Sequence, residues 1–386
     1  MIVLLIAVLY LSFISLGLPD SVLGSAWPTM FVEFNVPESY AGIVSAIIAF
    51  GTIISSLMSD RITKKLGASK TTVISILTTA LALLGFGISN KFYMICIFAI
   101  PYGLGAGSVD AALNNYVSLH FESKHMNWLH CMWGIGAATG PIIMGMVLTN
   151  SMSWNSAYII IGSIQAAICF LVFLSMPIWK KTVTKQQSEE KYDPIPLKHI
   201  LKFKGVKAVM ITFFCYCALE VVITLWASTY LNLQKGIPAE TAATWGGLYL
   251  IGITAGRAVC GFISMKLNDT QLTRLGEGIL FVGLVMLLLP LPNIYSLIAL
   301  VILGVGSAPI YPCVIHATPA RFGKDKSQAI IGVEMASAYT GTCLMPPLFG
   351  IIADYISISL FPVFLGILII AMIVLFEIML KKTTLK

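Results

Sequence analysis

Five ionisable side chains stand inside long apolar stretches of this sequence: Asp20, Asp110, Glu220, Arg257 and Glu334. A charged side chain at the centre of a bilayer costs about 2.5–3.5 kcal/mol on insertion scales. Such residues must therefore line a water-filled cavity, pair with one another or be protonated. In each of these arrangements a membrane protein can use the side chain to hold an ion, a proton or a polar solute.

Asp20 lies in the segment "LPDSVLGSAWPTM", within an apolar run that begins at residue 1. One helix over residues 3–31 would be about 43 Å long, which exceeds the ~30 Å core of a bilayer. Gly17 and Pro19 weaken the helix beside the aspartate. We predict a break there, where freed carbonyls beside a carboxylate suit a cation or a proton. The structural alternative is a kink with a solvated aspartate near the outer mouth.

A second polar group follows in the fourth apolar stretch. Asp110 and Asn114 are four residues apart, which places both on one face of a helix. A carboxylate with the amides of Asn114 and Asn115 offers the donors and acceptors that solute hydroxyls require. The asparagines could equally join neighbouring helices. His130 can titrate near physiological pH, but it stands only four residues into its stretch, so an interfacial hydrogen bond is the alternative to a cavity role.

Arg257 and Glu334 each lie seven or eight residues from the predicted cytoplasmic end of a span, at matching depth. We therefore expect them to form a buried ion pair with a structural or gating role. Among the aromatic residues, Trp226, Tyr311 and Tyr339 are candidates to present a ring face or a donor to a substrate. Anchoring at the membrane surface is the alternative for aromatic residues near span ends.

Composition identifies the elements that must hold these residues. Hydrophobic residues make up 58% of the chain and charged residues 11%. A bilayer core takes roughly 20 apolar helical residues, and barrel strands would instead alternate over about ten. The fold is therefore expected to be an all-α integral membrane fold of twelve transmembrane helices, without a soluble domain. The spans lie near residues 3–31, 38–59, 71–89, 92–117, 126–149, 154–178, 206–231, 240–264, 273–290, 293–317, 327–352 and 355–380.

Basic residues indicate the orientation of these spans. With the N-terminus inside, 21 of the 24 Lys and Arg residues fall in cytoplasmic segments, which fits the positive-inside rule. We expect both termini to be cytoplasmic. The net charge of +7 then reflects topology, and no nucleic-acid partner is expected. The one long polar segment, residues 179–205, reads as a cytoplasmic linker between six-helix bundles at residues 1–178 and 206–386.

The two halves carry traces of a duplication. An offset of 201 residues aligns Gly103 with Gly304 and Gly105 with Gly306, and it also matches Phe121 with Phe322. The same offset pairs Ala137, Thr139 and Gly140 with Ala338, Thr340 and Gly341. An offset of 200 sets Asp20 beside Glu220, which makes Glu220 a further candidate for ion coupling.

Other classes of chemistry find no support in the sequence. All eight cysteines fall in predicted spans, where they pack as small apolar residues. No metal-binding cluster or convincing nucleophile and base pair is present, and "GLGAGS" lies inside a span without the context of a phosphate loop. We therefore expect no cofactor, no metal, no enzymatic activity and no direct use of ATP.

The segment "SDRITKK" between the second and third spans, together with two homologous six-span halves joined by a long loop, resembles the major facilitator superfamily. Asp60, Arg61, Lys64 and Lys65 match the superfamily's motif in that loop. The resemblance implies alternating access between the halves and a conformational latch at Asp60 and Arg61. The corresponding loop of the second half, "SMKLND", lacks the aspartate, so Lys266 alone matches there.

Several spans resemble the fucose/glucose–proton symporter branch of that superfamily. The segments are Asp20, "GLGAGSVDAALNNYV", "NWLHCMWGIGAATGP" and "CYCALEVVITLWASTYL". Asp110 stands where that branch usually has glutamate, and His130 where it usually has an amide. The resemblance implies symport of a monosaccharide with a cation, H⁺ ahead of Na⁺, by a monomer in contact with membrane lipid, with the substrate held between the halves.

Other functions stay open on the sequence. One is an efflux or exchange carrier for an amphiphilic compound or an organic acid, which the Met-rich spans would tolerate. Another is a non-transporting receptor or lipid-handling protein on the same fold. The expected location is a cellular membrane, with the bacterial cytoplasmic membrane favoured by the compact length.

Overall fold

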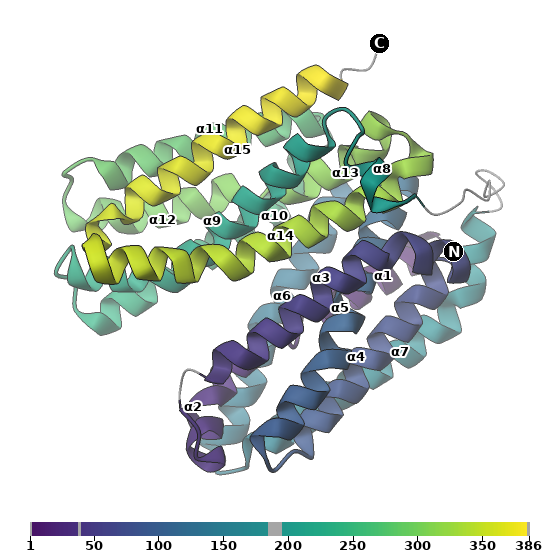
Figure 1. The fold of residues 1–386 in the computed structure, drawn as a ribbon, viewed down its shortest axis with the longest axis horizontal. Coiled ribbons are helices and arrows are strands. Elements are labelled where there is room, and N and C mark those ends of the chain that lie inside the picture. Colours follow the sequence, from purple (N-terminus) through teal and green to yellow (C-terminus); the bar gives the residue numbers. More distant parts are fainter. Residues whose placement is uncertain (1, 38–39, 184–194, 384–386) are drawn as a thin grey trace. The chain divides into compact units, whose positions relative to one another are not determined.

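The computed structural model describes residues 2–37, 40–183 and 195–383, and their regular elements are all helices. In chain order these are α1 (Ile2–Gly17), α2 (Val22–Phe34), α3 (Ala41–Leu66), α4 (Ala68–Gly87), α5 (Phe92–His120), α6 (Ser123–Thr149), α7 (Trp154–Val183), α8 (Leu197–Ile200), α9 (Val206–Leu233), α10 (Ala239–Ile263), α11 (Asp269–Leu288), α12 (Asn293–Ser307), α13 (Ile310–Phe322), α14 (Lys324–Ile352) and α15 (Phe361–Thr383). Figure 1 labels them.

These helices agree with the predicted twelve-span architecture. Within the described residues, eleven apolar segments are long enough to cross a membrane. The last of them, Lys324–Thr383, holds both α14 and α15, which short π-helical and 3₁₀ turns join. The protein is therefore an all-α integral membrane protein.

Contacts divide the chain into two compact units, which are described separately. The N-terminal unit comprises Met1–Tyr116 and Leu129–Ile195, and the C-terminal unit comprises Val117–Trp128 and Pro196–Lys386. The turn between α5 and α6 thus counts with the C-terminal helices. Of the predicted linker at residues 179–205, α7 occupies the beginning and α8 a short part near the end, and residues 184–194 lie outside the described residues.

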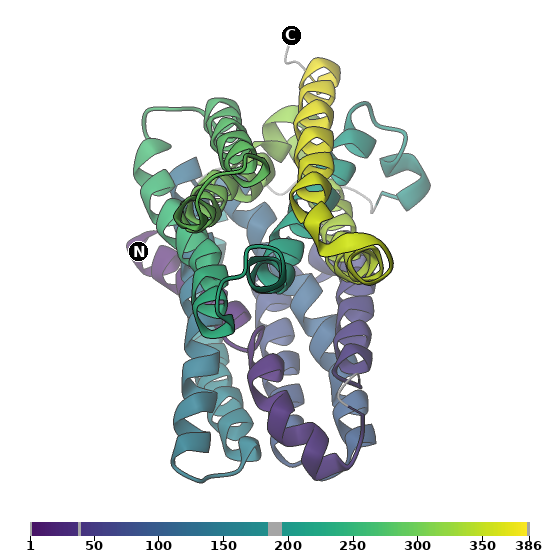
Figure 2. The same ribbon diagram turned by 90° about the vertical axis from the view of Figure 1, so that its left-hand side faces the viewer.

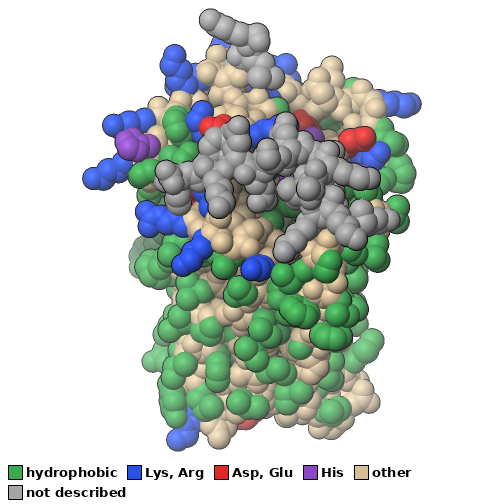
Figure 3. Space-filling view, turned by 90° about the vertical axis from the view of Figure 1, so that its right-hand side faces the viewer, with side chains coloured by type: hydrophobic (Ala, Val, Ile, Leu, Met, Phe, Trp, Pro, Cys, Tyr) green, Lys and Arg blue, Asp and Glu red, His purple; other side chains and the backbone are tan. Residues whose placement is uncertain are grey.

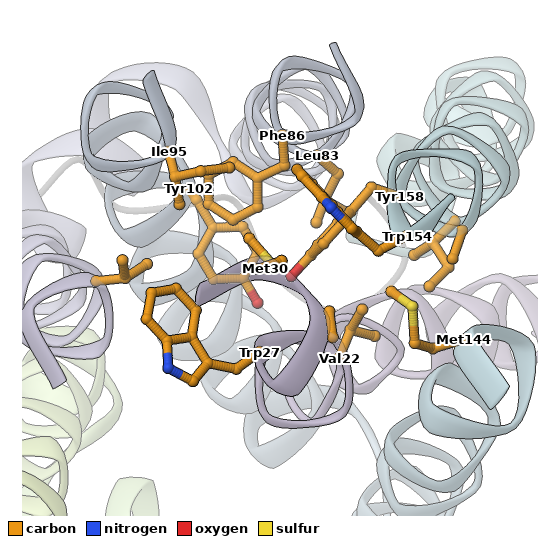
Figure 4. Packing of buried hydrophobic residues seen from close by; sticks show 14 of the residues in the cluster. Val22, Trp27, Met30, Leu83, Phe86, Ile95, Tyr102, Met144, Trp154 and Tyr158 are labelled. Atoms are coloured by element: carbon orange, nitrogen blue, oxygen red, sulfur yellow. The ribbon is translucent and has the colours of Figure 1, made fainter. Parts of the chain in front are cut away.

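In the N-terminal unit, α4 packs along α7, and α1 packs against both (Figure 1). A buried apolar cluster fixes α2 on these helices (Figure 4). Its members include Trp27 and Met30 from α2, Phe86 from α4, and Tyr158 from α7. Rings of this size exclude water over a large area, so the cluster holds α2 in a fixed direction after the break that follows α1.

In the C-terminal unit, α9 is the central helix. It packs against α14, α15 and α10, and α12 packs against α10 and α11 (Figures 1 and 2). The short α13 follows α12 inside the same predicted span, after Pro309. Hydropathy predicts a single helix at residues 293–317, whereas the structure has two helices there, α12 and the first part of α13.

Paired glycines show the same packing in both units, as the 201-residue offset predicts. A Cβ at Gly103 would collide with the Ile48 carbonyl of α3, and one at Gly304 would collide with the Tyr249 carbonyl of α10. Ile48 and Tyr249 are themselves 201 residues apart. Because only glycine allows the backbones to approach this closely, the duplicated residues perform the same structural task twice.

Much of the surface is apolar, as contact with lipid requires. Leu81, Phe170 and Phe262 expose 58%, 61% and 60% of their surface. Figure 3 shows one face on which hydrophobic side chains form a broad zone and Lys and Arg side chains gather beyond it. A water-soluble protein rarely exposes contiguous apolar surface on this scale.

Candidate functional site

Asp20 lies at a break in the first span, as the sequence predicts. Helix α1 ends at Gly17, α2 begins at Val22, and Pro19 lies between them. Trp133 of α6 donates its indole N–H to Asp20 Oδ2 over 2.8 Å, and the Tyr102 hydroxyl of α5 is 3.4 Å from Oδ1. Asp20 is nevertheless exposed, so this residue is both anchored and accessible to solvent.

Close approach between α1 and α6 brings Trp133 to Asp20. A Cβ at Gly17 would collide with the Trp133 carbonyl, and one at Gly136 would collide with the Ile14 carbonyl. These two glycines therefore let the backbones of α1 and α6 touch just before the break. From this contact the Trp133 indole reaches across to the Asp20 carboxylate.

Tyr102, the second partner of Asp20, is held in place by apolar packing. Its ring is buried in the apolar cluster and stacks on Phe86 with centroids 6.3 Å apart (Figure 4). Its hydroxyl is the polar end of an otherwise apolar side chain, and burial normally requires a partner for such a group. Asp20 supplies that partner.

The second polar group is a hydrogen-bonded series that joins α5 to α6. Asn114 donates from Nδ2 to Asp110 Oδ1 over 2.8 Å, which confirms that the two residues share one helix face. Asn114 Oδ1 lies 3.0 Å from His130 Nε2. Because an amide oxygen only accepts, His130 must donate from Nε2. Asp110, Asn114 and His130 are each at most 4% exposed.

The two polar groups of the N-terminal unit are both connected to α5. Tyr102, which contacts Asp20, and Asp110 are eight residues apart on this helix, about two turns. Asn115, which the sequence also suggests for substrate binding, is 7% exposed on the same helix. An accessible carboxylate is thus connected through α5 to a buried carboxyl, whose amide partner in turn binds an imidazole. Such an arrangement is suited to moving a proton or ordering a polar solute.

In the C-terminal unit, Arg257 of α10 pairs with α9. Its Nη2 lies 3.7 Å from Glu220 Oε2 and donates to the Tyr216 hydroxyl over 3.3 Å. The prediction that Arg257 pairs with Glu334 is wrong. Glu334 instead accepts from the Thr318 hydroxyl of α13, at 3.1 Å and 3.3 Å to its two oxygens.

The predicted aromatic candidates have defined surroundings. Tyr311 donates its hydroxyl to Met335 Sδ over 2.9 Å, and its ring lies 5.7 Å from that of Tyr216. Trp226 donates its indole N–H to the Pro346 carbonyl over 3.1 Å, so only its ring face is available to a ligand. Tyr339, on α14, is partly buried.

The predicted latch residues lie at the end of α3. Asp60 is 4% exposed and forms an ion pair with Lys64 at 3.1 Å. It also accepts from the backbone N–H of Ile195 over 3.1 Å. Asp60 thereby ties α3 to a residue that lies two positions before α8. Arg61, its neighbour in the motif, is exposed.

His316 of α13 holds the turn between α5 and α6 within the C-terminal unit. Its Nδ1 lies 2.6 Å from Asp269 Oδ2, and its Nε2 lies 2.8 Å from the Phe121 carbonyl. Ser123 donates to the other oxygen of Asp269. One histidine and one aspartate therefore connect α13, α11 and this turn.

Sequence reasoning missed three of the polar partners: Trp133, Tyr102 and Tyr216. Tyr216 precedes Glu220 by four residues, so helix periodicity alone could have indicated it. Trp133 and Tyr102 are distant in sequence from Asp20 and reach it only through helix packing. The described residues contain no group of three or more His, Cys, Asp or Glu that could hold a metal ion.

Known membrane transporters are similar to this chain over most of its length. A model of the Major Facilitator Superfamily matches residues 9–333. The glucose/mannose transporter GlcP of Bacillus subtilis (strain 168) is 21% identical over 355 residues, covering 88% of this chain and 86% of its own. The uncharacterized MFS-type transporter YfkL of the same organism is 23% identical over 351 residues, covering 89% and 88%.

A solved structure has the same fold over nearly the whole chain. The structure of FucP from E. coli gives a TM-score of 0.76 at 15% identity, covering 96% of this chain and 98% of that one. The proton:xylose symporter XylE gives 0.78 at 12% identity, covering 97% and 95%. At these identities the likeness establishes the fold.

Proposed function

Since this chain belongs to the Major Facilitator Superfamily of membrane transporters, we propose that it carries a monosaccharide together with a proton by alternating access. The observation that carries this proposal is the series Asp110–Asn114–His130, which begins about two turns along α5 from the Tyr102 that contacts the accessible Asp20. It combines a carboxyl able to exchange a proton with an amide and an imidazole able to bind hydroxyls.

The chemistry of the N-terminal unit supports sugar as the substrate class. A sugar presents hydroxyls that both donate and accept, and the site offers carboxylate oxygens, amide groups and an imidazole. In the C-terminal unit, the rings of Tyr311 and Trp226 offer apolar faces for the C–H side of a sugar. Substrate binding is proposed at Asp110, Asn114, Asn115, His130, Trp226, Tyr311 and Tyr339.

The relatives support the same substrate class. GlcP is a glucose/mannose transporter, FucP is a fucose:proton symporter and XylE is a proton:xylose symporter. Other relatives of this chain include a hexuronate transporter and a cis,cis-muconate transport protein. Sugars and carboxylated solutes are therefore the two substrate classes to compare first.

In the proposed cycle the two carboxyls of the N-terminal unit divide the work. Asp110 carries the proton beside the substrate, and Asp20 is exposed in the opposite access state. Glu220 is the third candidate for coupling, although Arg257 already neutralises its charge. Asp60 and Arg61 act as the latch between access states, and Arg257 and Glu334 stabilise the C-terminal unit during the change.

The proposed setting is a bacterial cytoplasmic membrane, with both termini cytoplasmic and the protein acting as a monomer. The bacterial relatives support this location, and the distribution of lysine and arginine supports the orientation.

Uptake into proteoliposomes tests the proposal. Vesicles with an alkaline interior should concentrate one of the labelled sugars glucose, mannose, fucose or xylose, and a protonophore should abolish the accumulation. Glucuronate and cis,cis-muconate serve as the carboxylated competitors. Accumulation driven only by a Na⁺ gradient would show that the coupling ion is Na⁺ and not the proton. Counterflow without concentration would indicate an exchange carrier, and the lack of flux for every solute would favour a receptor or lipid-handling role.

A further inference from the structure

The break in the first span leaves the backbone carbonyl of Ser15 without its helical donor. In a continuous α-helix, the N–H of residue 19 would donate to the carbonyl of Ser15. Residue 19 is proline, which has no N–H. On the near side Leu18 N still donates to the Ile14 carbonyl over 2.9 Å, as in a helix, and beyond the proline Asp20 N donates to the Gly17 carbonyl over 3.0 Å in a tighter turn that spans three residues. Pro19 thus creates a deficit at Ser15, five residues before Asp20.

Gln165 of α7 fills this deficit. Its side-chain Nε2 donates to the Ser15 carbonyl. Ser15 is fully buried and Gln165 is 2% exposed, so both groups are shielded from bulk water. The orientation of the amide is determined by its acceptor, because a flipped amide would set one carbonyl oxygen against another.

The same glutamine also lines a pocket whose wall includes Tyr102, a hydrogen-bond partner of Asp20. A pocket in the N-terminal unit is lined by Ser15, Pro19, Thr79, Tyr102 and Gln165, among others. Ser15 Oγ and Gln165 Oε1 are buried there and have no hydrogen-bond partner among the residues that the structure describes. Tyr102 forms part of the pocket wall and directs its hydroxyl to Asp20.

We propose that Gln165 is a positioning residue for Asp20. Its amide replaces the intrahelical hydrogen bond that Pro19 removes, and it thereby fixes the break between α1 and α2 where Asp20 meets Trp133 and Tyr102. Without this bond, the end of α1 loses its connection to α7 at the point where the chain changes direction. The consequence for transport rests on the role proposed above for Asp20, whereas the replacement of the bond does not.

A double-mutant cycle tests the replacement without any substrate. Gln165→Met keeps the length of the side chain and removes the donor, and Pro19→Ala supplies the missing N–H. Gln165→Met should lower the apparent melting temperature in detergent by roughly 2–4 °C. It should also speed hydrogen exchange of the backbone amides of residues 17–22. Both effects should nearly vanish in the Pro19→Ala background. Effects of equal size in the two backgrounds would overturn the proposal.

A second cycle tests positioning. Gln165→Met should slow proton-driven uptake of the best sugar of the panel by roughly fivefold, the factor that one hydrogen bond is worth. In the Asp20→Asn background it should slow uptake no further. An equal slowing in both backgrounds would show that Gln165 does not act through Asp20. Wild-type uptake by Asp20→Asn alone would overturn the role of Asp20 and the transport consequence with it, while the first cycle still decides on the bond.

Asn155→Leu is the matched control. Asn155 also lies on α7 and donates its side-chain amide to a backbone carbonyl, that of Ser89, over 3.0 Å. The loss of this bond should lower the melting temperature but leave uptake per folded molecule unchanged, and it should show no dependence on Pro19. If Asn155→Leu slowed uptake as much as Gln165→Met, the effect of the glutamine would be general destabilisation.

Discussion

The guanidinium of Arg257 lies 3.7 Å from the Glu220 carboxylate, and Glu334 is bonded to Thr318 instead. Arg257 is 3% exposed, so its charge is buried and depends on α9 for compensation. The pair fixes α10 to α9 one turn from Tyr216, which binds the same guanidinium group. The coupling candidate Glu220 is therefore also a structural partner.

Removing either member of this pair should destabilise the protein. Arg257→Met should cost about 3–5 kcal/mol, because the loss of one partner leaves the other charge uncompensated. The double variant Glu220→Gln/Arg257→Met should lose less than the sum of the single losses. Unfolding in detergent measures both. Glu334→Gln combined with Arg257→Met is the control and should be additive; additivity in the Glu220 cycle would instead refute the pair.

Replacing glycine by alanine should affect stability differently at close helix contacts and at open positions. Gly103→Ala and Gly304→Ala should each destabilise the protein by about 1–3 kcal/mol, because the new Cβ meets a backbone carbonyl that cannot move aside. Gly145 of α6 and Gly278 of α11 have open space where a Cβ would lie. Alanine at these two control positions should be neutral or stabilise by up to about 1 kcal/mol. Equal losses at all four positions would contradict the assignment of close helix contacts.

The sequence predicts those features that depend on periodicity and composition. Span number, the break at Asp20, the shared face of Asp110 and Asn114, and the duplication all follow from local patterns along one helix or from a constant offset. Each of these depends on residues that are close in sequence or are repeated, which is why the structure agrees with them.

The partners of charged residues could not be predicted in the same way. Arg257 and Glu334 lie at similar depth, but depth along the membrane normal says nothing about which way each helix is rotated or which helix is its neighbour. Trp133 reaches Asp20 only because Gly17 and Gly136 allow α1 and α6 to touch. Such contacts depend on how the helices pack, and the pattern of residues along a single sequence does not reveal which helices are neighbours.

Trp133→Phe should weaken transport through the loss of one hydrogen bond to Asp20. A hydrogen bond to a charged group is worth about 1.5–3 kcal/mol, so the rate of proton-driven uptake should fall roughly tenfold or more. The matched control is Trp154→Phe, since Trp154 donates its indole N–H to another carboxylate, Glu33, over 2.7 Å in the same unit. Uptake should be measured per folded molecule. Equal losses of uptake in the two variants would show that the hydrogen bond from Trp133 to Asp20 has no specific role in transport.

Asp60→Asn should slow the change between access states more than it weakens substrate binding. The carboxylate connects Lys64 and the Ile195 backbone, and neither contact belongs to the polar groups around Asp20 and Asp110. Uptake should fall roughly tenfold, the effect of about 1.4 kcal/mol on a barrier, with the dissociation constant nearly unchanged. Lys70→Gln, an exposed charge change on α4, is the control. Unchanged transport kinetics in Asp60→Asn would exclude the latch.

Asp110→Asn should separate binding from coupling. The amide mimics a permanently protonated carboxyl and can still accept the hydrogen bond that Asn114 donates to Asp110 Oδ1. We expect the variant to bind sugar and to exchange it across the membrane, and to lose accumulation driven by a pH gradient. Asp110→Glu, which keeps the ionisable group, is the control and should retain part of the accumulation. Uphill accumulation by Asp110→Asn at the wild-type level would move the proton site to Asp20 or Glu220.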